Sequence, residues 1–474
     1  MTNSKEQEKV QKLYNLIGER GLYVNTNYDI FTKKPEEIAL SMGAGYKIPL
    51  ISKGAKAYSS PLLFAALTSL LNHGTMLITG APGIGKTTGA EYAGHFFTGT
   101  KLDEILASEL QGHPQQTEEK LVASYDLGKL VKQGIRKVIP NRFLQSPVKI
   151  LDEGNRFPAD VLSIIMRLVD TGKAVYGGEV LEAKPGPLFL TANYQDEGTF
   201  QLTPPFLDRF DVGVMVTSPQ PWDLRKIRER GDEKLNGNLE KILEIPENLK
   251  LNFEQIRKEI KGIDEQVEYD VPVVNAFADF LYGSLRFSEA ASNNSARATK
   301  GNAWHLSQEN APAGHFNDSP FNYTLNELSV RTSKAIPRYA KAFAWFNGKD
   351  KVELGDLKTV LPYLLWHKIQ PSSKALSENQ IYENDRIAFV EDLVGKVEGE
   401  FNEALSTDAI KYYNVALNAL RTGKIKDKIL TEDELRTIVK SSIAKLGEVD
   451  KPYALTFANH IASEYNCNGK HETN

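Results

Sequence analysis

The chain of 474 residues has one cysteine, Cys467, and no apolar segment long enough to cross a membrane. A single cysteine excludes an internal disulfide and any cysteine-rich metal site. The longest apolar run, PLLFAALTSLL at 61–71, falls short of the roughly 20 residues that a membrane-spanning helix needs. The N-terminal MTNSKEQEKV lacks the apolar core of a signal peptide. We therefore expect a cytoplasmic protein with no membrane partner.

The sequence also lacks a strong charge of either sign and any histidines at metal-binding spacing. Lysine and arginine total 57 and aspartate and glutamate 61, so the formal net charge is -4. A protein that binds polyanions generally carries a positive excess, so this balance argues against nucleic acid as a partner but leaves room for a local basic groove. None of the eight histidines has the spacing of a metal site, and magnesium is the only metal that we infer.

What the sequence does contain is a glycine-rich segment, GAPGIGKT (80–87), that fits the pattern G-x-x-x-x-G-K-[ST]. The apolar residues 76–78 before it predict a buried strand, and 86–97 predict a helix. Glycines let consecutive N–H groups turn around a phosphate, and the helix directs its positive end to the same place. An ordinary glycine turn is the alternative. The predicted nucleotide-binding residues are Gly80, Ala81, Pro82, Gly83, Ile84, Gly85, Lys86, Thr87 and Thr88.

Two acidic residues end a second apolar strand, in VKILDEGNRF (148–157). In a P-loop fold such a strand lies beside the one that precedes the glycine loop. Lys86 is then expected to reach the β- and γ-phosphates, and Thr87 and Asp152 to hold Mg²⁺. Glu153 is one residue further and can polarise a water for attack on the γ-phosphorus. Without a phosphate site, the pair would be an exposed acidic turn.

A third apolar strand, in PLFLTANYQDEG (187–198), ends at Asn193. A strand beside the acidic one would place this amide between the γ-phosphate and the attacking water. The segment 193–196, NYQD, differs from the guanine-specific N-K-x-D pattern because the lysine is missing, so we expect ATP. Just before this strand, AVYGGEVL (174–181) predicts a β-hairpin, since both glycines of a two-residue turn accept positive φ.

Four segments in this order resemble the MoxR group of AAA+ ATPases: GAPGIGKT (80–87), ILDEGNR (150–156), LTANYQDEGTFQLTPPFLDRF (190–210) and LSVRTSKAIPRYAKAF (328–343). The predicted hairpin fits the same clade, which includes magnesium chelatase subunits. The resemblance covers roughly 57–370. It implies an α/β P-loop core, with a parallel sheet flanked by helices, and a helical lid. It also implies that Asn193 is the residue called sensor 1.

The resemblance implies roles for several arginines. Arg209 in LDRF matches the arginine finger that completes the site of a neighbouring subunit; a surface pair with Asp208 is the alternative. Arg331 matches sensor 2, at the start of a lid helix capped by Ser329.

The roles of two further arginines stay open. Pro337 interrupts the expected lid helix and should kink it, which makes Arg338 the fallback for sensor 2. Arg156 serves the same subunit interface as Arg209 or pairs with a nearby acid.

The segment between the P-loop helix and the acidic strand is longer than a plain connection requires. The clade carries an insertion here that faces the pore or a partner, and QGHPQQTEE (111–119) is our candidate, with a helix starting near Thr117. A local basic excess follows, which fits a solvated helix face or a nucleic-acid contact: Lys129, Lys132, Arg136, Lys137 and Arg142.

The resemblance, together with composition and apolar spacing outside it, implies four parts of the chain. Residues 1–56 form a helical N-terminal segment, and 57–222 the large ATPase domain. Residues 223–370 form a helical lid, interrupted by a Ser-, Asn- and Gly-rich insertion at 284–322. The helical spacing of apolar residues in 371–474 predicts a C-terminal helical domain.

The expected activity is Mg²⁺-dependent hydrolysis of ATP. The resemblance implies a ring, a hexamer by analogy, that remodels or matures a partner protein, often one with a von Willebrand type A domain. An alternative is a motor that acts on nucleic acid in a restriction or replication complex, which would need a basic pore. A third class, a non-hydrolysing regulatory subunit, is disfavoured by Glu153.

Overall fold

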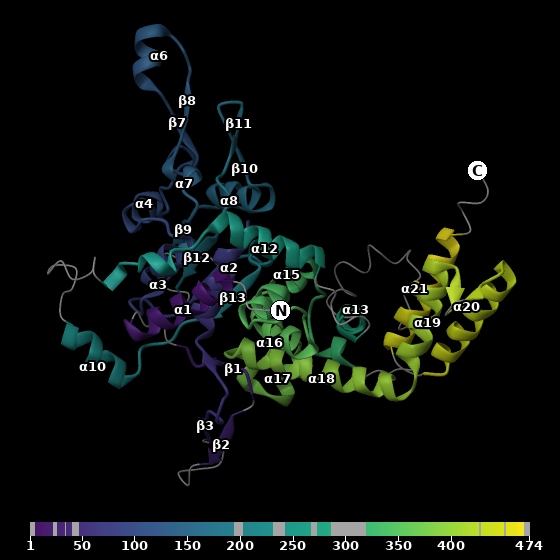
Figure 1. The fold of residues 1–474 in the computed structure, drawn as a ribbon. Helices are drawn as coiled ribbons and strands as arrows, with labels where there is room; N and C mark the ends of the chain where they lie inside the picture. The colour runs from purple at the N-terminus through teal and green to yellow at the C-terminus, as the bar shows by residue number, and fades with distance from the viewer. Residues whose placement is uncertain are drawn as a thin grey trace. The chain divides into compact units, whose positions relative to one another are not determined.

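The structure is a computed structural model that describes residues 5–21, 26–33, 35–39, 47–193, 202–230, 242–266, 273–285, 319–425, 428–449 and 452–468. The chain forms two compact units. The first contains Met1–Val267 and Lys334–Lys351, and the second contains Glu268–Ser333 and Val352–Asn474 (Figure 1). Within the described ranges, no helix has both the length and the apolar character needed to cross a membrane.

A five-stranded sheet, in the order β13-β5-β12-β9-β6, is the centre of the first unit (Figure 1). Its strands are β5 (Thr75–Thr79), β6 (Leu110–Gln111), β9 (Lys149–Asp152), β12 (Leu188–Ala192) and β13 (Val212–Met215). Each strand runs parallel to its neighbours. The loops that follow β5, β9 and β12 therefore begin at one edge of the sheet, which is where α/β folds bind ligands. Because β12 lies between β5 and β9, the expectation that the acidic strand lies directly beside the strand before the glycine loop is wrong.

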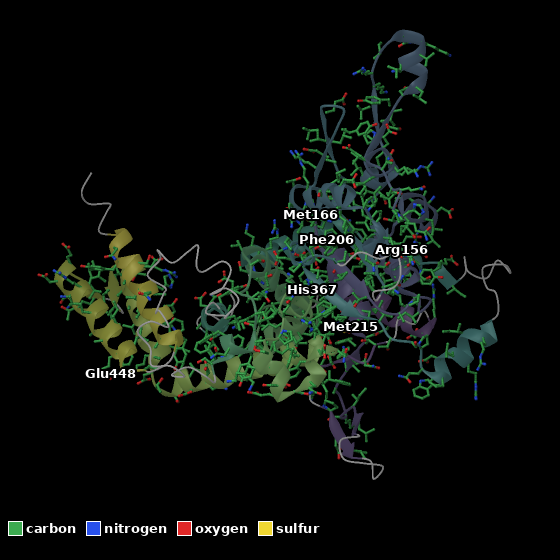
Figure 2. The ribbon with its side chains drawn as sticks, turned by 180° about the vertical axis from the view of Figure 1, so that it is seen from behind. Arg156, Met166, Phe206, Met215, His367 and Glu448 are labelled. Atoms are coloured by element: carbon green, nitrogen blue, oxygen red, sulfur yellow. The ribbon has the colours of Figure 1, made fainter. Side chains whose placement is uncertain are left out.

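Buried apolar side chains explain why these segments form the sheet and its covering helices. The strand interiors are continuous apolar runs, as in a parallel sheet covered on both faces. On α8 (Ala159–Thr171), Val161, Ile165 and Leu168 recur at helical spacing and are buried. Phe206, labelled in Figure 2, lies on the short α9 (Pro204–Leu207) and packs against the ring of Phe210 in the same core.

Further helices belong to the first unit. They are α2 (Ser60–Leu70), α3 (Lys86–Thr98), α4 (Leu102–Ser108), α5 (Glu118–Leu121), α7 (Arg142–Gln145), α10 (Pro221–Arg230), η2 (Glu247–Leu249) and α12 (Phe253–Gln266). Among them, α2, α3 and α4 contact strands of this sheet. The expected N-terminal helix is present as α1 (Lys5–Glu19), and the ring of its Tyr14 packs edge to face with the rings of Tyr58 and Phe346. The N-terminal segment also contains β1 (Ile30–Phe31), β2 (Glu36–Ala39), β3 (Lys47–Leu50) and β4 (Ala57–Tyr58).

Two antiparallel hairpins project from the same end of the first unit (Figure 1). The expected hairpin is confirmed: β10 (Lys173–Tyr176) pairs with β11 (Glu179–Glu182) through a two-glycine turn with positive φ. The second consists of β7 (Ala123–Tyr125) and β8 (Val138–Pro140), joined by α6 (Leu127–Gln133).

The second hairpin corrects the expected place of the insertion. Helix α5 begins after Thr117 as expected, but the projecting element spans 123–140 and not 111–119. The rings of Tyr125 and Tyr176, one from each hairpin, lie 5.3 Å apart, so the second hairpin contacts the β10–β11 hairpin beside its two-glycine turn.

The second unit is helical. Its elements are α13 (Val273–Leu285), η4 (Pro320–Tyr323), α16 (Leu354–Leu365), α17 (Ser373–Glu378), η5 (Gln380–Glu383), α18 (Arg386–Ser406), α19 (Ala409–Thr422), α20 (Glu432–Gly447) and α21 (Pro452–Asn468), with a small β14 (Lys424–Ile425) and β15 (Lys428–Ile429) hairpin. On α18, Val390, Leu393, Val397 and Phe401 recur at helical spacing and are buried, whereas Leu405 is exposed in the last turn. Helix α20 begins with a capping box formed by Thr431 and Glu434.

Helix α15 (Val330–Phe346) runs through the boundary between the units. It continues past Pro337, so the proline does not end it. Of the insertion expected at 284–322, residues 286–318 lie outside the described residues. The four-part division of the chain stays a prediction.

Candidate active site

The glycine loop connects β5 to α3 at the ligand-binding edge of the sheet. Gly83 and Gly85 have φ of 74° and 86°, a left-handed conformation that glycine adopts without strain. A Cβ on Gly80 would lie 2.4 Å from the carbonyl oxygen of Val216, so this position also requires glycine. The loop thus turns tightly into the N-terminus of a 13-residue helix, an arrangement suited to holding phosphate.

Lys86 is buried at the base of this loop. Its Nζ donates to the carbonyl oxygens of Gly80 at 3.0 Å and Ala81 at 2.6 Å, and to Oδ1 of Asn193 at 2.7 Å. Burial lowers the pKa of the Lys86 ammonium, while the carboxylates of Asp152 and Glu153 act in the opposite direction. The phosphate-binding lysine and the sensor asparagine expected from the sequence therefore lie in direct contact.

Asp152 ends β9 and faces two hydroxyl groups. Thr87 Oγ1 and Thr191 Oγ1 each donate to Oδ1 of Asp152 at 2.5 Å. Mg²⁺ prefers oxygen ligands and is bound through one or two protein groups with phosphate and water completing its shell. The adjacent hydroxyl of Thr87 and carboxylate of Asp152 fit that requirement, and they come from the two segments that the sequence analysis singled out.

Glu153 has an unusual backbone conformation. Its φ of 49° and ψ of 48° lie in the left-handed region, which a residue other than glycine adopts at a cost and often at functional sites. Asn193 Nδ2 donates to Glu153 Oε1 at 3.2 Å, and Arg156 Nε lies 3.2 Å from Oε2. The structure therefore brings the expected base together with the sensor, and Arg156, labelled in Figure 2, pairs with the acid three residues before it.

Two side chains that the sequence analysis did not assign support this site. The Thr191 hydroxyl accepts from the backbone N–H of Glu153 at 3.0 Å, and Asn155 Nδ2 donates to the carbonyl oxygen of Asn193 at 3.2 Å. Both side chains are buried. The signal for Thr191 was a polar residue inside an apolar strand two positions before the sensor.

Arg209 lies at the end of the sheet where β5 begins, opposite the end at which the glycine loop follows β5. Its Nε is 3.1 Å from Oδ2 of Asp170 on α8, and its Nη1 donates to the carbonyl oxygen of Pro205 at 2.5 Å. Its own carbonyl oxygen accepts from Thr75 Oγ1 at 3.1 Å. Since Thr75 begins β5 and the glycine loop follows its end, the structure does not bring Arg209 to the loop of the same chain.

The two candidates for sensor 2 have different surroundings. Arg338 Nη1 lies 3.4 Å from Oδ2 of Asp211, which directly precedes β13, so Arg338 is also at the edge opposite the glycine loop. Arg331 belongs to the second unit. The Ser329 hydroxyl accepts from the N–H of Thr332 at 3.2 Å, which caps α15 and places Arg331 in its first turn, as expected. The role of Arg331 stays a prediction.

Comparisons with known proteins agree with this geometry. Residues 75–210 match the model of an AAA domain of the dynein-related subfamily, and residues 326–387 match the model of an AAA lid domain. The chain is 20% identical over 259 residues to a magnesium-chelatase subunit ChlI homolog from Methanocaldococcus jannaschii. That match covers 54% of this chain and 59% of the relative, so the chain spans less than two thirds of that protein.

A likeness in fold is seen in the first of two solved structures. The crystal structure of a candidate ATPase from Cytophaga hutchinsonii has a TM-score of 0.53 and 19% identity, and the match covers 80% of this chain and 93% of that one. A full-length MCM homolog from Methanopyrus kandleri matches at a TM-score of 0.36 and 15% identity, over 65% of this chain and 55% of that one. The expected fold class is confirmed by the matched models and the parallel sheet.

Proposed function

We propose that this chain, for which the matched AAA models and the fold support ATP hydrolysis, works in a ring of subunits to remodel or mature a partner protein. The more specific MoxR assignment belongs to this proposal. It is supported by the order of the four resembling segments and by the two projecting hairpins. A hexameric ring and a cytoplasmic location are further parts of the proposal.

Phosphate binding falls to the glycine loop. We assign the α-, β- and γ-phosphates to residues 80–88, whose backbone N–H groups and helix N-terminus provide positive potential. Lys86 would exchange its two carbonyl acceptors for phosphate oxygens. Thr87 and Asp152 would hold Mg²⁺, which, when bound, neutralises charge on the β- and γ-phosphates.

Hydrolysis requires a base beside the attacking water. In the proposed step the water oxygen bonds to the γ-phosphorus while the bond to the bridging oxygen of ADP breaks, and Glu153 takes the proton. The two contacts of the Asn193 side chain are the observation that carries this assignment. Its amide accepts from Lys86 at 2.7 Å and donates to Glu153 at 3.2 Å, and so lies between the group for phosphate and the group for water.

The position of Arg209 favours a ring. An arginine that cannot reach its own glycine loop completes a site only in a neighbour, and a head-to-tail interface of this kind closes into a ring when the rotation allows. There its guanidinium would stabilise the charge on the transferring phosphoryl group. We propose this trans role for Arg209, and leave Arg331 as the proposed cis arginine of the lid.

The projecting hairpins are the proposed contact with the partner protein. Large apolar side chains on them are unusually exposed: Leu127 by 70%, Val131 by 82% and Val180 by 61%. Exposed apolar surface that is not packed in the subunit is typical of protein contacts. The resemblance makes a von Willebrand type A domain the first class of client to test.

One observation favours the nucleic-acid alternative, because lysines and arginines share this projecting segment. In the part of the chain that the structure describes, α6 and the residues after it carry Lys129, Lys132, Arg136 and Lys137 around the exposed apolar residues. Apolar side chains between the charges suit a protein surface better than a phosphate backbone, which is contacted through charge. We therefore rank a protein client first.

Capture of a client by Glu153→Gln in the native cell tests the proposal, because this variant should bind ATP without turning it over. A second variant, Glu153→Gln with Val131→Asp, should lose the client if the projecting hairpin contacts it. Glu153→Gln with Ile429→Asp is the matched control, since Ile429 is 72% exposed on the small hairpin of the second unit. Equal capture by all three variants would contradict a contact through α6.

A further inference from the structure

Thr191 occupies a central place in the site that no sequence motif assigns to it. It is the second-last residue of β12, and only 1% of it is exposed. Its Oγ1 donates to Oδ1 of Asp152 at 2.5 Å and accepts from the backbone N–H of Glu153 at 3.0 Å. A hydroxyl group has one proton to donate and lone pairs to accept, so one side chain serves both acidic residues.

The contact with Asp152 differs in an important way from that of Thr87. Both hydroxyls donate to the same carboxylate oxygen, Oδ1. Thr87 lies on the first turn of α3, where its oxygen is the proposed ligand of the metal. Thr191 lies on a strand between two hydrogen-bonded neighbours, β5 and β9. A side chain on a rigid central strand keeps its position better than one on a loop or at a helix end. Thr191 can therefore hold the Asp152 carboxylate in place while the Thr87 hydroxyl binds the metal.

The contact with Glu153 concerns the backbone. Glu153 has left-handed φ and ψ, which cost free energy unless surrounding contacts hold them. The hydrogen bond from its N–H to Thr191 is such a contact, and it acts at the residue whose side chain must point at the attacking water. Gly154, the next residue, also helps to hold this backbone. It packs so closely against Leu190 that an added Cβ would lie 2.6 Å from Cγ of Leu190.

We propose that Thr191 is a positioning residue for ATP hydrolysis: its hydroxyl sets the Asp152 carboxylate for the metal and holds Glu153 in its left-handed conformation. This inference rests on the proposed roles of Asp152 and Glu153. The alternative is that the Thr191 hydroxyl only satisfies the backbone N–H of Glu153. In that case its loss would lower the stability of the protein and leave the reaction unchanged.

The test compares Thr191→Val, which keeps the volume and removes the hydroxyl, with Thr191→Ser, which keeps the hydroxyl. Thr191→Ala serves if the valine variant fails to fold, because alanine and serine both lack the methyl group and differ in the hydroxyl. Thr68→Val is the matched control: Thr68 is fully buried, and its Oγ1 lies 3.0 Å from the hydroxyl of Tyr339, away from the site.

Two kinds of readout are needed. The first is steady-state kinetics with ATP and Mg²⁺: kcat, KM for ATP and the Mg²⁺ concentration for half-maximal rate. The second is amide hydrogen exchange across 150–156 in the full-length protein before ATP or Mg²⁺ is added. That measurement reports the Glu153 hydrogen bond without depending on turnover.

We expect Thr191→Val to lower kcat by about 10²-fold, the loss that a misplacement of about 1 Å causes, with KM for ATP unchanged. It should also raise the Mg²⁺ requirement and speed exchange across 150–156, while Thr191→Ser and Thr68→Val resemble the wild type. A hydroxyl-free variant with wild-type kcat and exchange overturns the inference. If Glu153→Gln itself hydrolyses ATP normally, the proposed function fails instead, so the two failures are distinguishable.

Discussion

The hydroxyl of Thr75 donates a hydrogen bond to the carbonyl oxygen of Arg209 at 3.1 Å. This contact anchors Arg209 where β5 begins, whereas the glycine loop starts where β5 ends. A five-residue strand separates these points by roughly 13 Å. Arg209 also pairs with Asp170 on its own edge of the sheet. The proposed assembly follows from this relationship, because a finger at this edge serves the nucleotide of a neighbouring subunit.

Binding and turnover should be separable by two substitutions. Lys86→Ala removes the ammonium that contacts the loop carbonyls and Asn193, and we expect it to abolish nucleotide binding. Glu153→Gln keeps the shape of the side chain and should bind ATP while kcat falls by roughly 10²–10⁴-fold, the usual contribution of a general base. Binding of a fluorescent ATP analogue and release of phosphate measure the two effects. Wild-type turnover by Glu153→Gln would remove Glu153 as the base.

Gly112→Ala should impair the site although Gly112 is not itself a predicted site residue. A Cβ at Gly112 would lie 2.2 Å from the carbonyl oxygen of Glu153, so the backbone of the base must move. We expect kcat to fall by about 10²-fold. Gly18→Ala is the control, because nothing lies within 4 Å of its added Cβ and alanine favours the helix α1. Equal turnover by both variants and the wild type would show that the position of the Glu153 backbone does not matter.

Much of this site followed from the order of residues along the chain. Apolar runs that end in Asp152 and Asn193, together with the glycine loop, were sufficient to expect a parallel sheet with both side chains at one edge. Because the strands are parallel, the residues that follow their carboxyl ends lie on the same side of the sheet. The contact between Asn193 and both Lys86 and Glu153 is the outcome of that rule.

What the sequence could not predict depends on contacts across strands or on exposed surface. The role of Thr191 requires the register of β12 beside β9, which no local pattern contains. The pair of Arg209 with Asp170 joins residues 39 positions apart. The helix α6 has apolar residues at helical spacing but no buried side chain, so its sequence does not distinguish a projecting helix from one that packs on the core.

Lys149 should make the stability of the protein depend on pH. Burial, with smaller effects of Lys184 and Arg257, lowers its pKa from 10.5 to about 8. Between these values the unfolded chain keeps a proton that the folded chain has lost, so the free energy of unfolding rises with pH. Lys149→Met removes this titration.

The comparison of wild type with Lys149→Met isolates the effect from other titrating groups. We expect the thermal unfolding midpoint of the wild type, relative to that of the variant, to gain in value as the pH rises from about 8 to about 10.5. The gain corresponds to at most roughly 3 kcal/mol. A difference between the two midpoints that stays constant over this range would contradict the lowered pKa.

Nucleic acid should bind weakly. With a net charge of -4, the chain should show no DNA affinity beyond a non-specific background of roughly 10⁻⁴–10⁻⁶ M at physiological salt. Fluorescence anisotropy with duplex and single-stranded DNA, at two salt concentrations, measures this. Tighter binding that also stimulates ATP hydrolysis would promote the nucleic-acid motor over the protein-remodelling ring.

The central claim is that Arg209 completes the site of a neighbouring subunit, and mixing two inactive variants tests it most directly. Arg209→Ala should bind ATP normally but lose roughly 10³–10⁵-fold in turnover, and Lys86→Ala should not bind ATP. In mixed rings, confirmed by native mass measurement, some junctions place an intact Lys86 opposite an intact Arg209. Our account predicts that such rings recover part of the ATPase activity; mixed rings that remain inactive would contradict it.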